Sequence, residues 1–413
     1  MSAQAPHLLI AGGGMVGLSL ALMLDAQLPE NARITLVEGV ALPDSDTHAP
    51  AYHPSFDARS TALSYSSARF YRELGIWDQL QAGLGTISSI HVSRRGRFGS
   101  SLLSAADQGW EALGWVVENP CLGRTLLAAA RQRPRIQLHC PARVTDAAPL
   151  GTGMRVSLGE QTKDVDLLII ADGAESALRD KLGFFTQKKL YGQHALIANL
   201  AFEGDHAGCA YERFTTSGPL ALLPLPDSAQ SANRMALVWS LNPEEAEQLQ
   251  GASDPDFSSA LLHAFGHRLG RVTRVGDRQA YPLTLTDARE QVRRGCIVLG
   301  NAAHALHPVA GQGFNLALRD AALLAETLAG AVNAEQDPGD VALLDVYMQA
   351  RAQDQGQTIA ASDGLPTLFM SRDPLLSLAR DLALSGLDFV PGLRRQFVRQ
   401  AAGMAAVEVS RGR

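Results

Sequence analysis

A glycine-rich turn near the start of the chain constrains the fold more than any other feature. Residues 7–11 are apolar and predict a strand, and residues 16–28 have a helical pattern. Gly12, Gly14 and Gly17 lie in and around the turn between them. Glycines at this spacing let the backbone approach a pyrophosphate at the helix N-terminus. The G-x-G-x-x-G pattern alone is a weak signal, because an ordinary tight turn would also explain it.

The acidic residue that ends the next predicted strand strengthens this interpretation. Residues 33–38 predict the strand, and Glu38 lies 21 residues after Gly17 (38 − 17 = 21). In a strand–helix–strand unit, a carboxylate at this distance can hydrogen-bond the ribose of a dinucleotide. Because it would repel a phosphate on that ribose, we predict a cofactor whose adenosine carries none.

A second glycine-rich stretch, residues 300–316, follows the apolar residues 296–299 and leads into a helical pattern. Gly311 and Gly313 allow backbone N–H groups to approach a ligand closely, and Pro308 stiffens the entry. The positive end of the helix dipole would favour a cofactor that becomes anionic during turnover. A purely structural turn before a helix is the alternative for this stretch taken by itself.

Polar residues also follow a predicted strand over residues 166–170. Asp172 and Gly173 come directly after it, and Ser176 and Arg179 come next. Ligands bind at such carboxyl edges of α/β sheets. The sequence therefore predicts that these residues belong to the same site as the glycine-rich turns.

Two arginines lie where a loop meets a predicted helix. Arg59 is a candidate for contact with phosphate or another ligand, with a surface ion pair to Asp57 as the alternative. Arg124 lies near the N-terminal end of a helix that opens at residue 119, where the dipole does not favour a cation. A phosphate or a flavin edge would explain it, and so would simple solvation.

The pattern changes between about residues 191 and 285, where short apolar strands alternate with turn residues. We predict an α/β protein in which a Rossmann-like nucleotide-binding domain carries an inserted antiparallel sheet and is followed by a helical region. The predicted divisions are 1–185 and 286–335 for the nucleotide-binding domain, 186–285 for the sheet domain and 336–413 for the helical region.

Composition excludes several other classes of protein. The net charge is −6 and long basic runs are absent, so no nucleic-acid partner is expected. The four cysteines form no C-x-x-C pair or metal-ligand spacing, which predicts reduced thiols, a cytoplasmic protein and no metal. Residues 8–24 are uncharged but short and glycine-interrupted, so we expect neither a signal peptide nor a membrane span. Arginines interleave with apolar residues in 365–380 and 387–404; we favour packing on the protein itself and leave contact with a membrane or a partner open.

Together, the three motifs resemble those of the class A flavoprotein aromatic hydroxylases, which are related to para-hydroxybenzoate hydroxylase. The motifs are Gly12-x-Gly14-x-x-Gly17, Asp172-Gly173 with Ser176 and Arg179, and Gly300-Asn301-Ala302-Ala303-His304 with His307-Pro308. The resemblance covers nearly the whole chain. Residues 57–63, 211–214, 218–224 and 307–316 resemble the 2-octaprenyl-6-methoxyphenol hydroxylases of ubiquinone biosynthesis. One position departs from the wider family: the third motif usually begins with Gly-Asp, and here it begins with Gly300-Asn301.

The resemblance implies one FAD per chain and assigns residues to it. Gly12, Gly14 and Gly17 would hold the pyrophosphate and Glu38 the adenosine ribose, while Arg59 and Arg124 would line the flavin. The other implied cofactor contacts are Asp172, Gly173, Arg179, Gly300, Asn301, Pro308, Gly311, Gly313, Phe314 and Asn315. Asp172 and Arg179 would also meet the passing NAD(P)H. Arg59, His307 and Pro308 are the candidates for residues that act in catalysis.

The reaction implied by the resemblance is hydroxylation of a polyprenylated phenol. NAD(P)H would reduce FAD, O2 would form a flavin C4a-hydroperoxide, and that species would transfer a hydroxyl to the ring. The alternatives are the same chemistry on a small aromatic acid or another ubiquinone precursor, and a non-catalytic FAD-fold binding protein. The W-x-W-x-I-P run of flavin-dependent halogenases is absent. Peripheral contact with the inner membrane, a multi-enzyme assembly and a homo-oligomer stay open.

Overall fold

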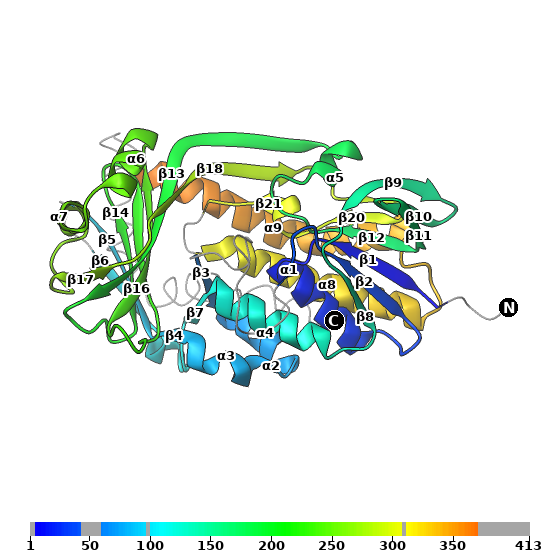
Figure 1. The fold of residues 1–413 in the computed structure, drawn as a ribbon, viewed down its shortest axis with the longest axis horizontal. Coiled ribbons are helices and arrows are strands. Elements are labelled where there is room, and N and C mark those ends of the chain that lie inside the picture. Colours follow the sequence, from blue (N-terminus) through cyan, green and yellow to red (C-terminus); the bar gives the residue numbers. More distant parts are fainter. Residues whose placement is uncertain (1–4, 43–58, 96–99, 308–310, 371–413) are drawn as a thin grey trace.

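A six-stranded, mostly parallel sheet forms one end of the molecule (Figure 1). The computed structural model describes residues 5–42, 59–95, 100–307 and 311–370, the side chains of 365–370 excepted. The strands, in the order β19-β20-β12-β1-β2-β8, are Val292–Arg293, Cys296–Val298, Leu167–Ile170, His7–Ala11, Arg33–Val37 and Ile136–His139. Every neighbouring pair is parallel except β19 with β20.

Both faces of this sheet are buried, because successive side chains of β1 point to opposite sides. Leu8 and Ile10 belong to the core on the helical side, whereas Leu9 and Ala11 belong to a second core on the other side. The antiparallel strands β9 (Val144–Leu150), β10 (Gly153–Leu158) and β11 (Gln161–Val165) contribute to that second core.

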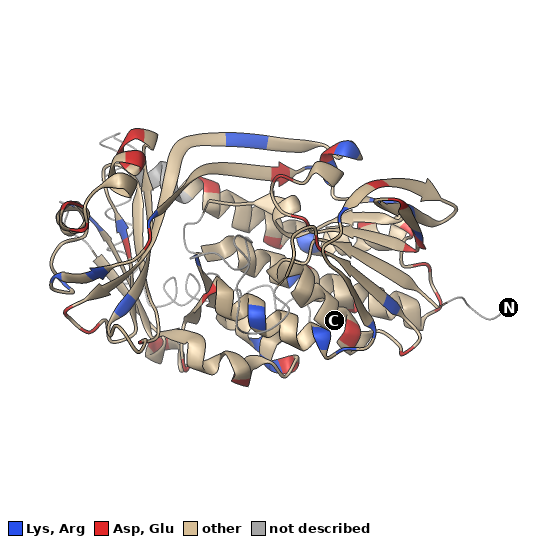
Figure 2. Cartoon of the chain, viewed as in Figure 1, with Lys and Arg blue, Asp and Glu red and all other residues tan. Residues whose placement is uncertain are grey.

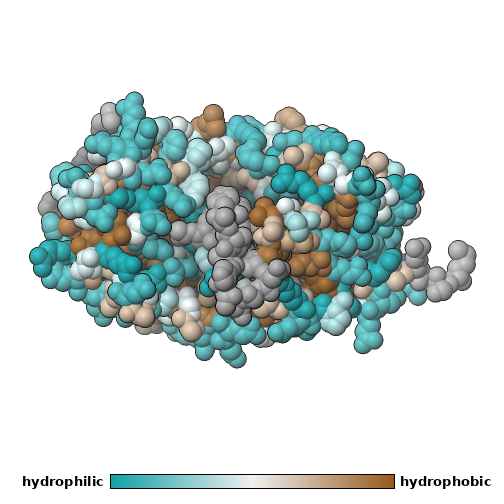
Figure 3. Space-filling view, in the orientation of Figure 1, coloured by the Kyte–Doolittle hydropathy of each residue, from teal (hydrophilic) through white to brown (hydrophobic). Residues whose placement is uncertain are grey.

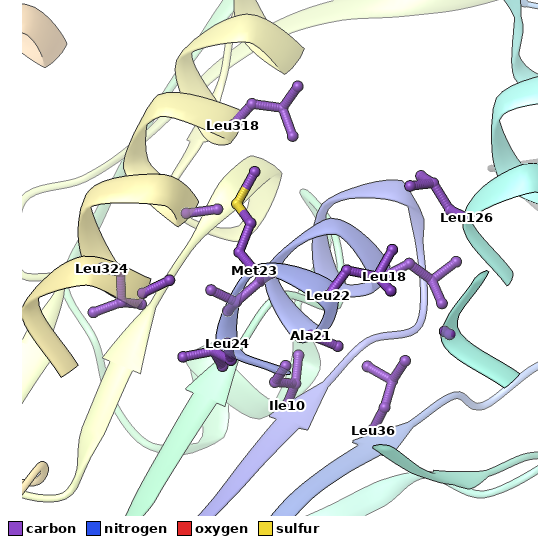
Figure 4. Packing of buried hydrophobic residues seen from close by; sticks show 14 of the residues in the cluster. Ile10, Leu18, Ala21, Leu22, Met23, Leu24, Leu36, Leu126, Leu318 and Leu324 are labelled. Atoms are coloured by element: carbon purple, nitrogen blue, oxygen red, sulfur yellow. The ribbon is translucent and has the colours of Figure 1, made fainter. Parts of the chain in front are cut away.

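Helix α1 fills the space between the sheet and two further helices (Figure 4). The helices on this side are α1 (Met15–Gln27), α2 (Tyr65–Glu73), α3 (Trp77–Leu80), α4 (Asn119–Arg131) and α8 (Gln312–Asn333). Leu18 and Leu22 of α1 are buried in one cluster with Leu126 of α4 and Leu318 of α8. Burying each such leucine contributes about 1.5–3 kcal/mol, so packing on both sides holds α1 in place.

A nine-stranded sheet forms the other end of the molecule (Figure 1). Its strands are β5 (Ser89–Arg94), β6 (Ser100–Ser104), β13 (Thr186–Phe202), β14 (Cys209–Phe214), β15 (Pro219–Pro224), β16 (Arg234–Leu241), β17 (Val272–Val275), β18 (Gln279–Ala288) and β21 (His304–Ala305). The long strands β13 and β18 run from this sheet towards the first one and pair along most of their length. The antiparallel sheet predicted within residues 186–285 is confirmed. It is extended by β5 and β6, from the range that we assigned to the nucleotide-binding domain, and β5 pairs with β14 in parallel.

One face of the nine-stranded sheet is covered by α6 (Pro243–Gly251) and α7 (Asp254–Phe265), which the sequence did not lead us to expect. Leu196, Leu222 and Leu237 of the sheet pack there against Phe257 and Leu261. The residues between them on the strands therefore face the opposite way, towards the small sheet of β3 (Ser60–Ser64), β4 (Leu84–Ile87) and β7 (Gly114–Glu118).

Helix α9 (Val341–Met370) packs along α8 through a buried polar network. Arg351 donates to Asp320 at 2.5 Å and Arg319 donates to Asp354 at 2.7 Å, so each cation has a carboxylate partner. The helical region predicted from residue 336 thus begins with α9, which continues to residue 370. Of the two arginine-containing segments, 365–380 and 387–404, only residues 365–370 lie within the described part of the chain, and there only their backbone is described.

Surface charge gives no strongly one-signed face in the view shown. Figure 2 shows Lys and Arg interspersed with Asp and Glu over both sheets. In Figure 3, hydrophilic side chains cover most of the same face, and hydrophobic ones gather near its middle, beside the grey atoms. Among the described residues, no helix has the length and apolarity needed to cross a membrane.

Candidate active site

The first glycine-rich turn packs backbone against backbone. Gly12 has a φ of +117°, and a Cβ there would lie 2.3 Å from the carbonyl oxygen of Ala171. A Cβ on Gly17 would lie 1.9 Å from the carbonyl oxygen of Gly12. Neither position has room for a side chain, so the end of β1, the start of α1 and the end of β12 come into direct contact.

The N-terminus of α1 presents the positive end of a helix dipole to the glycine-rich turn. Its N-cap is Gly14, no side chain caps it, and its first turn contains no acidic residue. Uncapped N–H groups at the positive end of a helix dipole bind anions such as phosphate. Glu38 lies beside this turn, where its two carboxylate oxygens accept hydrogen bonds from the backbone of Gly13 and Val40, both at 2.8 Å.

The Asp172 motif is adjacent to the first turn. The Cα atom of Asp172 would lie 2.8 Å from a Cβ on Gly12, and Gly173 has a φ of +100° with open space beside it. Ser176 caps α5 (Ala177–Lys181) by accepting from the backbone N–H of Arg179. The motif therefore lies at the carboxyl end of β12, as the sequence predicted.

Arg179 is fully buried and connects the second motif to the third. Its Nη1 donates to the carbonyl oxygens of Ala174 at 3.0 Å and Ala302 at 2.9 Å, and its Nε donates to Asp180 at 2.8 Å. A guanidinium so enclosed holds two loops together. We infer a positioning role for Arg179, and its contact with NAD(P)H stays a prediction.

The third motif closes the same region. Gly300 has a φ of +65°, and a Cβ there would lie 3.1 Å from Val16 in α1. Asn301 is exposed at the turn. Helix α8 begins after Gly311, which has a φ of +59° and no side-chain cap, and its first turn contains no acidic residue. The arrangement gives a second helix N-terminus with glycine at its N-cap, and Gly313 and the half-buried Phe314 lie in its first turn.

Asn315 joins the start of α8 to strand β3. Its Oδ1 accepts from Ser64 N at 2.8 Å and Ser67 Oγ at 2.7 Å. Its Nδ2 donates to the carbonyl oxygens of Ala62 at 2.8 Å and Gly311 at 2.7 Å. Because all four hydrogen bonds go to the protein, we infer that the Asn315 side chain shapes the wall of the site, and its contact with FAD stays a prediction.

Arg59 lies directly before β3 and contacts β18. Its guanidinium lies over the ring of Tyr281 in β18, 5.3 Å from the ring centroid. The carbonyl oxygen of Arg59 accepts from Asn119 N at 2.9 Å, which ties it to the start of α4. Arg124 is exposed on α4, and its role as a flavin contact stays a prediction. Pro308 and Asp57 lie outside the described residues.

His307 is buried at a junction that also contains Tyr191 and Asp363. The His307 ring meets the Tyr191 ring edge to face at 5.1 Å, and within the described part of the chain neither of its ring nitrogens has a hydrogen-bond partner. Burial lowers the pKa of His307 to about 4, although the charge of Asp363 opposes this. Asp363 accepts from Tyr191 at 2.8 Å and from Lys189 at 2.6 Å, and the Lys189 contact lowers its pKa. His307 is therefore neutral at pH 7.

The shifted pKa of His307 predicts acid-sensitive folding. The unfolded state binds the proton near pH 6.5 and the folded state only near pH 4, so the free energy of unfolding falls as pH drops through this interval. From pH 7.5 to 5 we expect His307 to account for a loss of about 2 kcal/mol. Urea unfolding at both pH values checks this. His307→Gln should lose that part of the slope, whereas the exposed His267→Gln should keep it; equal slopes for wild type and His307→Gln would contradict the assignment.

His304 contacts Asp287 and connects two parts of the chain. It is buried, and its Nδ1 lies 3.3 Å from Asp287 Oδ1 in β18. The neighbouring His304 ring lowers the pKa of Asp287. The contact ties the turn after Gly300 to the long strand β18.

Several residues beside the site were not singled out from the sequence. Tyr191, Tyr281 and Asp363 come from β13, β18 and α9, and no local motif marks them. Glu118 and Asn199 lie on β7 and β13 and are hydrogen-bonded to each other at 2.9 Å. Only strand alternation could have indicated Asn199, which shares a strand face with Ile197.

The motifs together form a continuous wall whose chemistry fits FAD. Two helix N-termini with glycine at the N-cap suit its pyrophosphate and a flavin that becomes anionic, and the side-chain-free turns allow close approach. The fold and site define an FAD-binding flavoprotein with a second sheet set against its nucleotide-binding part.

Comparison with known proteins identifies the family. The chain belongs to the family described as FAD binding domain, which matches residues 6–362. It is 34% identical over 401 residues to the ubiquinone hydroxylase UbiL of Rhodospirillum rubrum, covering 97% of this chain and 90% of that protein. It is 31% identical to the 3-demethoxyubiquinol 3-hydroxylase of Escherichia coli, covering 98% of this chain and all of that protein.

Solved structures share the fold. The p-nitrophenol 4-monooxygenase PnpA of Pseudomonas putida has a TM-score of 0.74 at 17% identity, with 97% of this chain and 99% of that one covered. PqsL of Pseudomonas aeruginosa, a probable FAD-dependent monooxygenase, has a TM-score of 0.72 at 19% identity, with 92% and 100% covered. The protein is an FAD-dependent aromatic monooxygenase with NAD(P)H as co-substrate.

Proposed function

We propose that this protein hydroxylates the ring of a polyprenylated phenol in ubiquinone biosynthesis. The observation that carries the proposal is similarity at 31–34% identity, over nearly the whole chain, to two hydroxylases named for ubiquinone or a demethoxyubiquinol. Apolar side chains on one face of the nine-stranded sheet also support the proposal. Ile197, Leu223 and Val238 are half-buried on the face opposite α6 and α7, where an apolar ring and tail would find apolar contact.

Separate groups of residues would bind the different parts of FAD. Gly12, Gly14 and Gly17 would hold the pyrophosphate of FAD and Glu38 its ribose. Bound FAD supplies acceptance of hydride from NAD(P)H and transfer of an oxygen atom to the ring. The N-terminus of α8 would stabilise negative charge at the flavin edge. His307 is buried and neutral at pH 7, and it stays a candidate for a residue that acts in catalysis.

A small aromatic acid as substrate is less well supported. Such a substrate needs an arginine free to bind its carboxylate. Arg234 is the candidate on this sheet, but its guanidinium already donates to both carboxylate oxygens of Glu118, at 2.9 and 3.3 Å. We therefore keep the prenylated phenol as the proposed substrate. Peripheral contact with a membrane, where such a substrate would dissolve, is part of the same proposal.

Purification followed by turnover tests the function. The protein is expected to be yellow, to oxidise NADPH when a phenol with a short prenyl tail is added, and to give a product heavier by one oxygen atom. 4-Hydroxybenzoate serves as the comparison substrate and should leave NADPH oxidation near its basal rate. Hydroxylation of the small acid alone would overturn the ubiquinone assignment, and a protein unable to hold FAD would overturn the enzyme.

A further inference from the structure

Two buried side-chain oxygens beside the proposed substrate site have no hydrogen-bond partner among the residues that the structure describes. They are Oδ1 of Asn199 in β13 and Oγ of Ser60 in β3. An unsatisfied buried acceptor costs free energy, and most such groups in proteins are paired with the protein or with water. Both atoms flank the same residue, Glu118, so they belong to one local arrangement.

The direction of the Asn199 oxygen is fixed by its neighbours. Asn199 Nδ2 donates to Glu118 Oε1 at 2.9 Å, and Arg234 Nη2 donates to the same oxygen at 2.9 Å. An ionised carboxylate held by an arginine can only accept hydrogen bonds, so the amide nitrogen of Asn199 must face it. The carbonyl oxygen therefore points away from Glu118. Only a hydrogen-bond donor can satisfy it.

Ser60 places the second oxygen next to the expected flavin. It is directly opposite Glu118 in the antiparallel pair of β3 with β7, so the two side chains lie on the same face. Ala62, two residues further on the same face, would contact a Cβ on Gly311 at 3.0 Å. This face of β3 thus runs from Asn199 and Glu118 to the N-terminus of α8.

The opposite wall is the apolar face of the nine-stranded sheet. Asn199 is two residues from Ile197, so both side chains lie on the same side of β13, and Ile197 pairs with Val238 across β16. A polar acceptor is thereby set among half-buried apolar side chains. That combination suits an apolar ring that carries a hydroxyl group.

We propose that Asn199 and Ser60 bind the oxygen substituents of the substrate ring and so determine specificity for a phenol. Asn199 Oδ1 accepts the hydrogen of the ring hydroxyl, and the Ser60 hydroxyl, which can donate or accept, takes an adjacent oxygen. Glu118 and Arg234 are positioning residues that fix the Asn199 amide. The inference rests on the proposed function and adds to it the side chains that recognise the ring.

Ligand discrimination tests the assignment. Binding is measured from the change in flavin absorbance on titration with a short-tailed prenylphenol and with its methyl ether, which lacks the hydroxyl hydrogen. Wild type should prefer the phenol by about tenfold or more, the worth of one well-placed hydrogen bond. Asn199→Leu should weaken phenol binding by about tenfold and ether binding by no more than about twofold. Loss of general packing would weaken both ligands alike.

Further variants keep the test decisive. Ser60→Ala removes one oxygen with little change in volume and should also reduce the preference for the phenol, so it serves if Asn199→Leu does not fold. Gln193→Leu, an amide in the same strand that donates to Ser217 O, is the matched control and should leave the preference unchanged. Unchanged discrimination in both Asn199→Leu and Ser60→Ala would overturn the inference and would point to bound water as the partner of these oxygens. A wild-type protein that binds neither ligand would overturn the proposed function, and the inference with it.

Discussion

Replacing Gly12 with alanine is expected to abolish retention of FAD, with an affinity loss of about 100-fold or more. A Cβ at this position would lie 2.3 Å from the carbonyl oxygen of Ala171, and the residue has a φ of +117° that alanine rarely adopts. Relieving the contact must move β1 away from β12, which widens the turn where the pyrophosphate would bind. The measurement is FAD content after purification, followed by titration of the apoprotein with FAD.

The matched control is a glycine whose Cβ would meet nothing. Gly330 lies inside α8, and a Cβ added there would have no atom within 4 Å. Gly330→Ala should therefore retain FAD, and its free energy of unfolding should rise by about 0.5–1 kcal/mol. Circular dichroism and urea unfolding separate loss of FAD from loss of fold in Gly12→Ala. If that variant bound FAD within about threefold of wild type, the turn would not be the pyrophosphate site.

Local sequence patterns predicted the elements that carry the cofactor motifs. The helix expected over residues 16–28 is Met15–Gln27, and the strand expected over 33–38 is Arg33–Val37 followed by Glu38. These succeeded because the periodicity of apolar residues and the glycine punctuation are both local. The same reasoning explains why the antiparallel sheet within residues 186–285 was predicted and confirmed.

What could not be predicted depends on contacts between distant parts of the chain. The sequence predicted that Arg179 contacts a ligand. In the structure its guanidinium is buried and donates to the carbonyl oxygens of Ala174 and Ala302, the latter 123 residues away. Asn199 and Glu118 are separated by 81 residues and carry no motif. Helices α6 and α7 were missed because their mixed polar and apolar residues lie within a segment dominated by strands. Only the packing of the two sheets brings these groups together.

Replacing Asn315 with leucine is expected to lower the free energy of unfolding by about 3–5 kcal/mol and to weaken FAD binding. The side chain is 2% exposed and makes four hydrogen bonds that join α8 to β3. Leucine branches at the same carbon but leaves the amide of Ser64 and the carbonyls of Ala62 and Gly311 buried without partners, at about 1–3 kcal/mol each before relaxation. Urea unfolding with and without FAD measures both effects.

Asn315→Asp separates the donors of this side chain from its acceptors. It keeps the oxygen that Ser64 and Ser67 use but places a second oxygen against the carbonyls of Ala62 and Gly311. Burial and these carbonyls should raise the carboxyl pKa in the folded state above its unfolded value near 3.9. The stability deficit relative to wild type should then be largest at neutral pH and shrink as pH falls and the carboxyl is protonated. Asn333→Leu, at the exposed end of α8, is the control and should change stability by less than about 0.5 kcal/mol. If Asn315→Leu were no more destabilised than this control, the four hydrogen bonds would not hold the wall of the site in place.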